Sequence, residues 1–439
     1  MISREEVREL AQFGDERACA LSFYFQPTPP RNKAHKEEVI LTKDLAREAL
    51  RRLEGSGKCE SARADLDRIL RLSQDLCGNR THAKAVFACS AQGFWREYDL
   101  PAQLPGTQLL VDRHFHLKPL ARLLGAFPRL GIVLLDRHRA RLFDLRLGEL
   151  TEREGFFQAL SRRGRGDGFA GYDGGHAQRR VADETRQHFK RLAEFLMNAL
   201  AKNSDKDRDR DRDRGKGKDK NDKDKSKDRG TFEQWILGCQ DTHWPQFAAQ
   251  LHPYVSQRLL GRFSADVVHV TRDAIRGKAE KIFTEAQNRR CQEAVREAIN
   301  QARGNARGVT GLRRVLRSLE LGEVQTLLLG DNYSAQAVEC SGCGHLDAHL
   351  VHFCPVCGRE TRAVVDVAEA ILPWVIRHDI ELFYVKNDPE FDKIGNIAAV
   401  LRFRSEADSP ARPIAAASAH QPPGPRSRLV GRYRGLASG

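Results

Sequence analysis

The chain has 439 residues, of which 40% are hydrophobic and 30% charged, with a formal net charge of +14. This composition is that of a globular protein, and the length allows two or three domains. No apolar stretch approaches the ~20 residues of a membrane span, and the start predicts an amphipathic helix rather than a signal peptide, so we expect a cytoplasmic protein. The positive excess favours a polyanionic partner such as RNA over a charge that only maintains solubility.

Residues 1–120 predict an N-terminal α+β domain. Strand-like runs rich in aromatic residues alternate with two helical patterns along this segment. The expected strands cover 20–25, 85–89 and 93–98, and the expected helices cover about 36–53 and 61–76.

Residues 121–270 predict a second domain built on a hairpin. A Gly-rich basic loop follows the hairpin and ends at His176, and a long helix is expected from about Gln178. Val181, Phe189, Leu192 and Leu196 recur at helical spacing, so we expect them to pack this helix on the sheet. The remaining expected elements are hairpin strands at 131–135 and 141–145, strands at 235–238 and 267–270, and a helix over 244–260.

Residues 203–229 alternate Asp with Lys or Arg almost without interruption. Such a segment has nothing apolar to bury, so it predicts a disordered insertion. Its opposite charges nearly cancel, and it therefore does not account for the positive excess of the whole chain.

Residues 271–404 predict a third domain with alternating helices and strands, which favours an α/β sandwich. A flexible tail is expected over 405–439. The expected helices cover about 273–302, the stretch from Leu312, and 366–378, and the expected strands cover 326–329, 381–385 and 397–403. The fold class is thus α/β and α+β multidomain, with three domains.

A zinc-knuckle insertion is expected in the third domain. Cys340 and Cys343, and Cys354 and Cys357, form two Cys-x-x-Cys knuckles, each followed by glycine. Four thiolates fill a tetrahedral Zn²⁺ site and leave no open position, which predicts a structural zinc and disfavours two disulfides or a redox pair. The nearby His345, His349 and His352 are interpreted as residues of an ordinary polar loop, and the six other cysteines as isolated thiols.

Three segments in this order resemble a known family. Residues 311–329, the knuckles and 394–403 resemble the last domain of archaeo-eukaryotic class I release factors and Pelota, which closes on Gly-Gly-Ile-x-Ala-x-Leu-Arg-Tyr. Asn396 replaces the second Gly and Phe403 the Tyr. Upstream, Gly174-Gly-His176 and a basic helix occupy the place of the family's Gly-Gly-Gln loop and helix. The chain therefore resembles a bacterial archaeo-eukaryotic-type release factor, well from about 121 to 404 and weakly before.

The resemblance implies that the loop with Gly174, Gly175 and His176 enters the peptidyl transferase centre of the ribosome. Glycines allow close approach of the backbone, and His176 either positions water as a peptidyl-tRNA ester hydrolase would, or belongs to a loop that docks without hydrolysis. Whether the chain is an enzyme stays open here. The flanking arginines suit contact with RNA phosphates; they are Arg162, Arg163, Arg165, Arg179, Arg180 and Arg186.

The first 120 residues hold no Asn-Ile-Lys-Ser segment of the kind that reads stop codons in the family. We therefore expect a codon-independent factor in ribosome rescue or hibernation, a monomer off the ribosome, with the ribosomal A site as its partner. Whether tRNA and a translational GTPase are further partners stays open here. The alternatives are a peptidyl-tRNA hydrolase, an RNA- or tRNA-processing nuclease that would use groups such as Asp136, His138 and Asp173, and a zinc-stabilised RNA-binding protein without catalysis.

Overall fold

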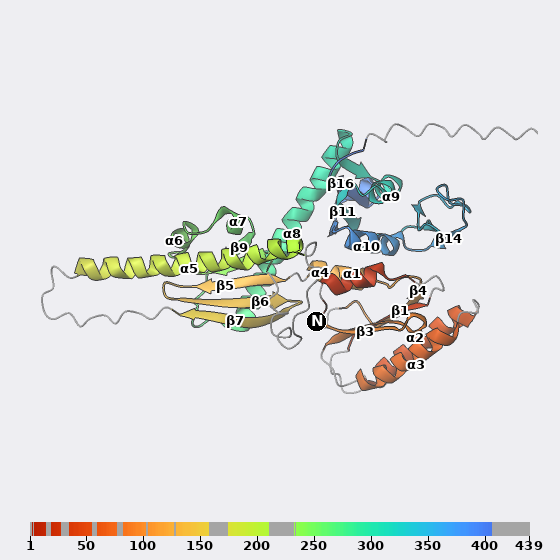
Figure 1. The fold of residues 1–439 in the computed structure, drawn as a ribbon, viewed down its shortest axis with the longest axis horizontal. Coiled ribbons are helices and arrows are strands. Elements are labelled where there is room, and N and C mark those ends of the chain that lie inside the picture. The colour runs from red at the N-terminus through yellow and green to blue at the C-terminus, as the bar shows by residue number, and fades with distance from the viewer. Residues whose placement is uncertain are drawn as a thin grey trace, which may run out of the picture.

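The computed structural model describes residues 2, 4–14, 19–27, 35–54, 59–76, 82–101, 104–126, 129–157, 174–209, 232 and 234–405. Within these residues the chain is a mixed α/β protein with several separate sheets (Figure 1). In the described residues, no helix combines the length and the apolar character that crossing a membrane requires.

The N-terminal part, residues 4–126, is an antiparallel sheet of order β3-β2-β1-β4 with helices on both faces. Phe23 on the central strand packs under α2 and α3, whereas its neighbour Tyr24 faces α1 and α4, as the two-residue period of a strand requires. The elements are α1 (Arg4–Gln12), β1 (Ala20–Phe25), α2 (His35–Glu54), α3 (Cys59–Leu76), β2 (Ala83–Cys89), η1 (Ser90–Gln92), β3 (Phe94–Leu100), β4 (Gln108–Asp112) and α4 (Lys118–Ala126).

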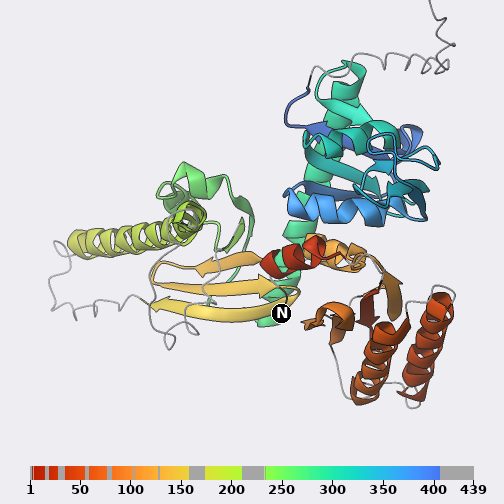
Figure 2. The ribbon, with the colours of Figure 1, turned by 45° about the vertical axis from the view of Figure 1, so that its right-hand side comes forward.

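The middle part, residues 129–263, is a mixed sheet of order β7-β6-β5-β8-β9. The strand β5 is antiparallel to β6 and parallel to β8, and it is buried along its whole length. Helix α5 covers one face of this sheet, as Figure 2 shows. The elements are β5 (Leu130–Leu135), β6 (Arg139–Arg146), β7 (Glu149–Phe157), α5 (Gly174–Asp209), β8 (Gln234–Gly238), α6 (Trp244–Ala248), α7 (Pro253–Ser256) and β9 (Leu259–Phe263).

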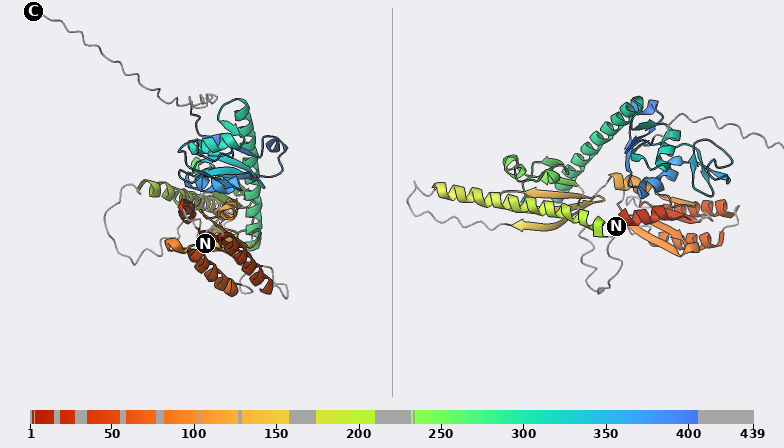
Figure 3. Two further views of the ribbon diagram at one scale, coloured as in Figure 1. Left: turned by 90° about the vertical axis from the view of Figure 1, so that its right-hand side faces the viewer. Right: turned by 45° about the horizontal axis from the view of Figure 1, so that its top comes forward.

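The long helix α8 (Arg272–Arg303) connects the middle sheet to the C-terminal sheet, and Figure 3 shows it running between them. Thr271 caps its start by accepting a hydrogen bond from the Ala274 N–H. Ile275, early in the helix, is buried in the middle core, and Ile299, late in the helix, is buried in the C-terminal core. One continuous helix, about 48 Å long at 1.5 Å per residue, therefore contributes to two cores.

The C-terminal part, residues 304–405, has a four-stranded sheet of order β10-β16-β11-β15, between α8 on one face and α9 with α10 on the other. A small sheet of order β13-β12-β14 carries the cysteines. The elements are β10 (Gly308–Thr310), α9 (Leu312–Glu320), β11 (Val324–Gly330), β12 (Ala337–Cys340), β13 (Leu346–Asp347), β14 (Thr361–Val364), α10 (Val367–Arg377), β15 (Glu381–Val385), α11 (Pro389–Lys393) and β16 (Ile397–Leu401).

Two predicted elements of the middle part are wrong. The helix expected over 244–260 is two short helices followed by the start of β9, because Pro253 begins α7 after the cap residue His252. The strand expected at 267–270 is a turn, in which Val267 is buried but Val268 is 51% exposed. The apolar residues at 267–270 therefore bury one side chain in the core but form no strand.

The edges of other predicted segments also shift. Residues 203–209 of the expected disordered insertion continue α5 as helix, and 210–229 lie outside the described residues, as does the tail from 406. The expected border at residue 121 falls inside α4, whose Leu120 and Leu123 are buried in the N-terminal core. The last strand ends at Leu401.

Candidate functional site

The two knuckles have the same backbone geometry. In the first, the Cys340 N–H donates to the His345 carbonyl at 2.8 Å, and the Gly344 N–H donates to the Cys340 carbonyl at 3.2 Å. In the second, the Cys354 N–H donates to the Arg359 carbonyl at 2.8 Å and the Gly358 N–H to the Cys354 carbonyl at 2.9 Å. Both glycines have positive φ, +72° and +74°, a conformation that a side chain disfavours.

These turns bring four sulfurs together. The Sγ atoms of Cys340, Cys343, Cys354 and Cys357 all lie within 4.8 Å of one another. The separations are 3.3 Å between Cys340 and Cys357 and 3.6 Å between Cys343 and Cys354, close to the about 3.8 Å between sulfurs bound to one tetrahedral Zn²⁺. A disulfide would need about 2.05 Å, so none of these sulfur pairs is a disulfide in the structure, and the arrangement suits a metal ion.

Backbone N–H groups donate hydrogen bonds to two of the four sulfurs. The Cys343 N–H and the Gly342 N–H donate to the Cys340 Sγ at 3.4 and 3.3 Å, and the Val356 N–H donates to the Cys354 Sγ at 3.4 Å. The hydrogen bond from the Cys343 N–H, with that from Gly342, lowers the pKa of Cys340 to about 6. At Cys343 the backbone N–H of His345 lowers the pKa, but burial and the three other sulfurs raise it to about 12. Since thiolates are the metal-binding form of cysteine, the four-cysteine centre fits a structural metal ion.

The neighbouring histidines take other partners. His345 Nδ1 lies 2.6 Å from a Glu320 carboxylate oxygen, and His349 Nδ1 lies 3.1 Å from an Asp347 carboxylate oxygen. Among the described residues, the group that could hold a metal ion consists of the four cysteines. The interpretation of His345 and His349 as polar loop residues therefore agrees with the structure.

The Gly-Gly-His segment lies in a helix and not in a loop. Gly174, Gly175 and His176 form the first turn of α5, which begins four residues earlier than the expected start at Gln178. The expected glycine-rich loop before this turn lies outside the described residues. The segment is thus presented at the N-terminal end of a helix of 36 residues.

Helix α5 is fixed to the middle sheet by its apolar side. Phe189, Leu192 and Leu196 are buried against the sheet, as expected, and the Phe189 ring meets the Phe247 ring edge-on at 5.5 Å. Val181 does not join them, since it is 37% exposed. Among the residues of α5 whose burial is described, packing therefore begins at Thr185, about two turns after the Gly-Gly-His segment, whereas Arg179 and residues 181–183 are exposed.

The predicted RNA-binding arginines are only partly described. Arg179 and Arg186 lie on α5 and are exposed, as are Lys190 and Arg191 further along. Arg162, Arg163 and Arg165 lie outside the described residues, and so does the side chain of Arg180. The structure thus places basic residues on the exposed side of α5 without bringing them to a common ligand.

The groups weighed for a nuclease have a structural use. The Asp136 carboxylate accepts hydrogen bonds from the backbone N–H groups of His138 and Arg139, both at 2.7 Å, and so closes the turn between β5 and β6. Asp173 lies outside the described residues. The buried His188, which sequence reasoning missed, has a lowered pKa because of burial, and its Nε2 has no hydrogen-bond partner among the described residues.

The described chain is therefore a mixed α/β protein with a four-cysteine centre and a long helix that begins at a Gly-Gly-His turn. Residues 116–208, which span α4, β5 to β7 and nearly all of α5, match the family described as bacterial archaeo-eukaryotic release factor family 10. The predicted resemblance to these release factors is thereby confirmed.

Solved structures of translation termination factors and of Pelota also align with the chain. The alignment with the archaeal translation termination factor aRF1 has 16% identity and a TM-score of 0.24. It covers 92% of this chain and 99% of the aRF1 chain. Dom34 of S. cerevisiae, a translation termination-like factor, is 9% identical over 92% and 93%, with a TM-score of 0.36. Pelota of Archaeoglobus fulgidus is 13% identical over 75% and 81%, with a TM-score of 0.30. No protein of curated function matches in sequence.

Proposed function

We propose that the chain is a release-factor-like translation factor that binds the ribosome without reading a stop codon and acts in rescue or hibernation. The observation that carries this proposal is the family match over 116–208, which includes the Gly174-Gly-His176 turn and the helix that presents it. The basic balance of the chain, +14, supports a partner made largely of RNA.

Helix α5 would be the element that contacts ribosomal RNA. Arg179 and Arg186 lie exposed on it, and its N-terminal end has the positive end of the helix dipole. Unsatisfied N–H groups and arginines both suit phosphate oxygens. Because glycine has no side chain, Gly174 and Gly175 would let the backbone approach the peptidyl-tRNA ester closely.

Two roles for His176 follow from its place in this turn. As a neutral imidazole it could accept a proton from water that attacks the peptidyl-tRNA ester, which would make the chain a hydrolase. Alternatively, the turn occupies the peptidyl transferase centre and His176 takes no part in a reaction. We favour occupancy, since the family's Gln is replaced.

The four cysteines would hold a structural Zn²⁺. Four thiolates complete a tetrahedron, so the ion would have no open position for substrate or water and would stabilise the small sheet.

We also propose three domains that correspond to the three parts described above, with the first border near residue 127. The chain would be a monomer off the ribosome and would be located in the cytoplasm. Its further partners would be tRNA and a translational GTPase.

Co-sedimentation with purified ribosomes tests the proposal. We expect the full chain to migrate with 50S or 70S particles in a sucrose gradient, and Arg179→Gln with Arg186→Gln on α5 to weaken this association. Arg289→Gln with Arg296→Gln, two exposed arginines on α8, removes the same charge elsewhere and serves as the control. A wild-type chain that stays at the top of the gradient would refute ribosome binding.

Release of labelled peptide from stalled ribosomes separates the two roles of His176. Occupancy predicts no release above background by the wild-type chain, although it binds. Hydrolysis predicts release that falls strongly in His176→Ala while binding persists. Equal release by the wild-type chain and by His176→Ala would show that the reaction does not use the His176 side chain.

A further inference from the structure

The N-terminal and C-terminal parts touch along one continuous surface. Helix α1 packs on α10, and α4 contacts both α10 and β15. Ile376 of α10 packs against the N-terminal core, so the contact has an apolar centre. Figures 1 and 2 both show α1 and α4 lying directly beside α10.

Charges across this contact are sorted by side. In the pairs across this contact, most of the basic side chains belong to the N-terminal part and most of the carboxylates to the C-terminal part. The reverse pair is Arg362 with Asp112 at 3.2 Å. We call the basic groups of segment 114–122 the basic stripe, and the carboxylates that face them the acidic face. The basic stripe is His114, His116, Lys118 and Arg122, and the acidic face is Asp331, Glu339, Asp366 and Glu369.

The middle of the contact surrounds the start of α10. The Lys118 ammonium lies 2.6 Å from the Asp366 carboxylate. The Glu369 carboxylate accepts hydrogen bonds from the backbone N–H groups of Leu117 at 3.3 Å and Lys118 at 3.1 Å, and it lies 3.0 Å from His116 Nδ1. One carboxylate is thus held by two main-chain donors and an imidazole.

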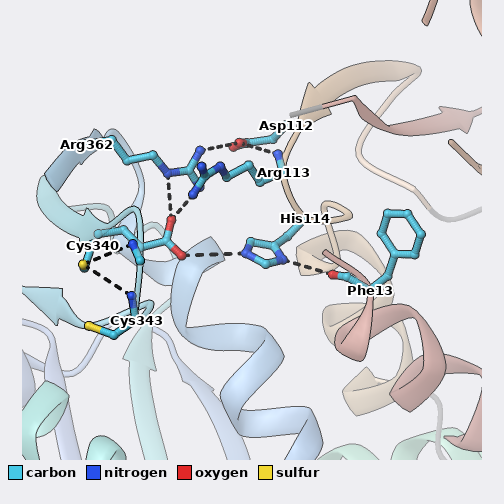
Figure 4. A network of polar contacts seen from close by, with 9 residues as sticks. Phe13, Asp112, Arg113, His114, Cys340, Cys343 and Arg362 are labelled. Atoms are coloured by element: carbon cyan, nitrogen blue, oxygen red, sulfur yellow. Dashed lines mark hydrogen bonds and ion pairs between the residues drawn. The ribbon is translucent and has the colours of Figure 1, made fainter. Parts of the chain in front are cut away.

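One edge of the contact reaches the cysteine centre. Figure 4 shows Arg362, from the small sheet, extending to Asp112, and His114 lying beside them. His114 Nε2 lies 3.7 Å from a Glu339 carboxylate oxygen, and its Nδ1 lies 3.0 Å from the Phe13 carbonyl oxygen.

The opposite edge is held by arginines. Arg122 donates to the Asp331 carbonyl oxygen, lies 3.6 Å from the Asp331 carboxylate, and places its guanidinium over the Tyr384 ring at 5.0 Å. Arg8 of α1 pairs with Asp379, just after α10. The ion pairs therefore extend across the whole contact.

We propose that this contact is an electrostatic latch, in which the acidic face covers a basic stripe that otherwise binds an RNA phosphate backbone. The carboxylates take the positions that phosphates would take on the stripe, since both are anions that accept from Lys, Arg, His and main-chain N–H groups. The pairs are accessible to screening, with 19% of the Lys118 side chain and 27% of the Asp366 side chain exposed. A polyanion gains several such contacts at once and releases counterions, so it competes effectively with an internal acidic surface.

The latch is independent of the ribosome proposal, because it concerns RNA binding by the N-terminal part and not by α5. Its test uses the full chain with Asp366→Asn and Glu369→Gln. These changes remove two charges but keep the cap on α10, because Asn also accepts the hydrogen bond from the Ala368 N–H, and Gln keeps an oxygen for the Lys118 N–H. Glu390→Gln with Asp392→Asn, on the exposed surface of α11, changes the net charge equally and is the matched control.

Binding of a fluorescent single-stranded RNA oligonucleotide is measured by anisotropy at fixed salt, and hydrogen exchange is followed in segment 114–122. We expect the acidic-face variant to bind RNA about threefold or more tighter than the control variant, with faster exchange in the segment. Adding Lys118→Gln and Arg122→Gln to that variant is expected to abolish the gain. Independently of the variants, raising salt from about 50 mM to about 500 mM is expected to accelerate hydrogen exchange in segment 114–122 of the wild type.

Four outcomes overturn the proposal. Exchange that is insensitive to salt in the wild type shows that the contact is not an electrostatic latch. Faster exchange without tighter RNA binding, or a gain equal to that of the control variant, shows that the stripe does not bind RNA. A poly-glutamate peptide that opens the contact as well as RNA does shows that phosphates are not preferred.

Discussion

Glu339 and Arg362 face each other across β12 and β14, and the Arg362 Nε donates to the Glu339 Oε2 at 2.9 Å. Glu339 directly precedes Cys340 of the four-cysteine centre, and in the same pair of strands Cys340 lies opposite Thr361. The ion pair and the four-cysteine centre are therefore attached to the same two short strands. We expect loss of order at one to reduce order at the other.

Removal of the metal is expected to loosen the small sheet before the rest of the C-terminal part. The sheet has three strands of two to four residues, whereas β11 of the large sheet is almost entirely buried. We expect about one zinc per chain by elemental analysis, and faster hydrogen exchange over 337–364 than over 324–330 after chelation.

Cys343→Ser is expected to lower the metal content, whereas Cys291→Ser, a cysteine on α8 outside the cluster, should leave it unchanged. A chain that is metal-free as purified in zinc-containing medium, yet protected over 337–364, would contradict a structural metal site.

Gly131→Ala is expected to destabilise the middle sheet. A Cβ atom at Gly131 would lie 2.4 Å from the ring of Trp235, which is fully buried. Overpacking of this kind costs about 1–3 kcal/mol, measurable by urea unfolding. Gly277→Ala on α8 is the control: nothing lies within 4 Å of its added Cβ, and Ala is the better helix former, so stability should stay equal or rise.

Asn396 is expected to tolerate Gly better than Ala. Its φ is +58°, directly after Gly395 at +90°, in the left-handed region that Asn and Gly adopt most readily. Asn396→Ala should cost about 1 kcal/mol in unfolding free energy, and Asn396→Gly should be nearly neutral. Equal stability of the two variants would show that this backbone conformation does not constrain the residue.

The stability contribution of His114 is expected to depend on pH. The interaction with Glu339, opposed by burial and aided by the Phe13 carbonyl, raises the pKa of His114 above 6.5. A base whose pKa is raised by folding binds protons more tightly in the folded state, so its contribution is complete below about pH 6.5 and is lost as pH rises through the folded-state pKa. Wild type should therefore exceed His114→Gln in unfolding free energy by more at about pH 5.5 than at about pH 8. A difference that stays constant or grows with pH would contradict this assignment.

Local patterns predicted much of the fold. The strand-like aromatic run at residues 20–25, the helical spacing of Phe189, Leu192 and Leu196, and the long helix from about 273 all correspond to observed elements. These patterns record burial against a sheet or a core, which depends on residues close in sequence. The predictions at 244–260 and 267–270 were wrong because the same apolar residues can be buried in short turns without forming a regular element.

The grouping of the four cysteines could be predicted, because two Cys-x-x-Cys turns with a following glycine carry their own geometry in consecutive residues. The Gly174-Gly-His176 turn could be found but not placed, and only the structure shows it as the first turn of α5. The contacts of Lys118 with Asp366, and of Arg362 with Asp112, join residues about 250 positions apart, so no local pattern reveals them. The sequence by itself determined the metal-type knuckles and most helices and strands; the tertiary structure alone decided which charged surfaces meet, because that depends on how α8 and the packed sheets bring distant segments together.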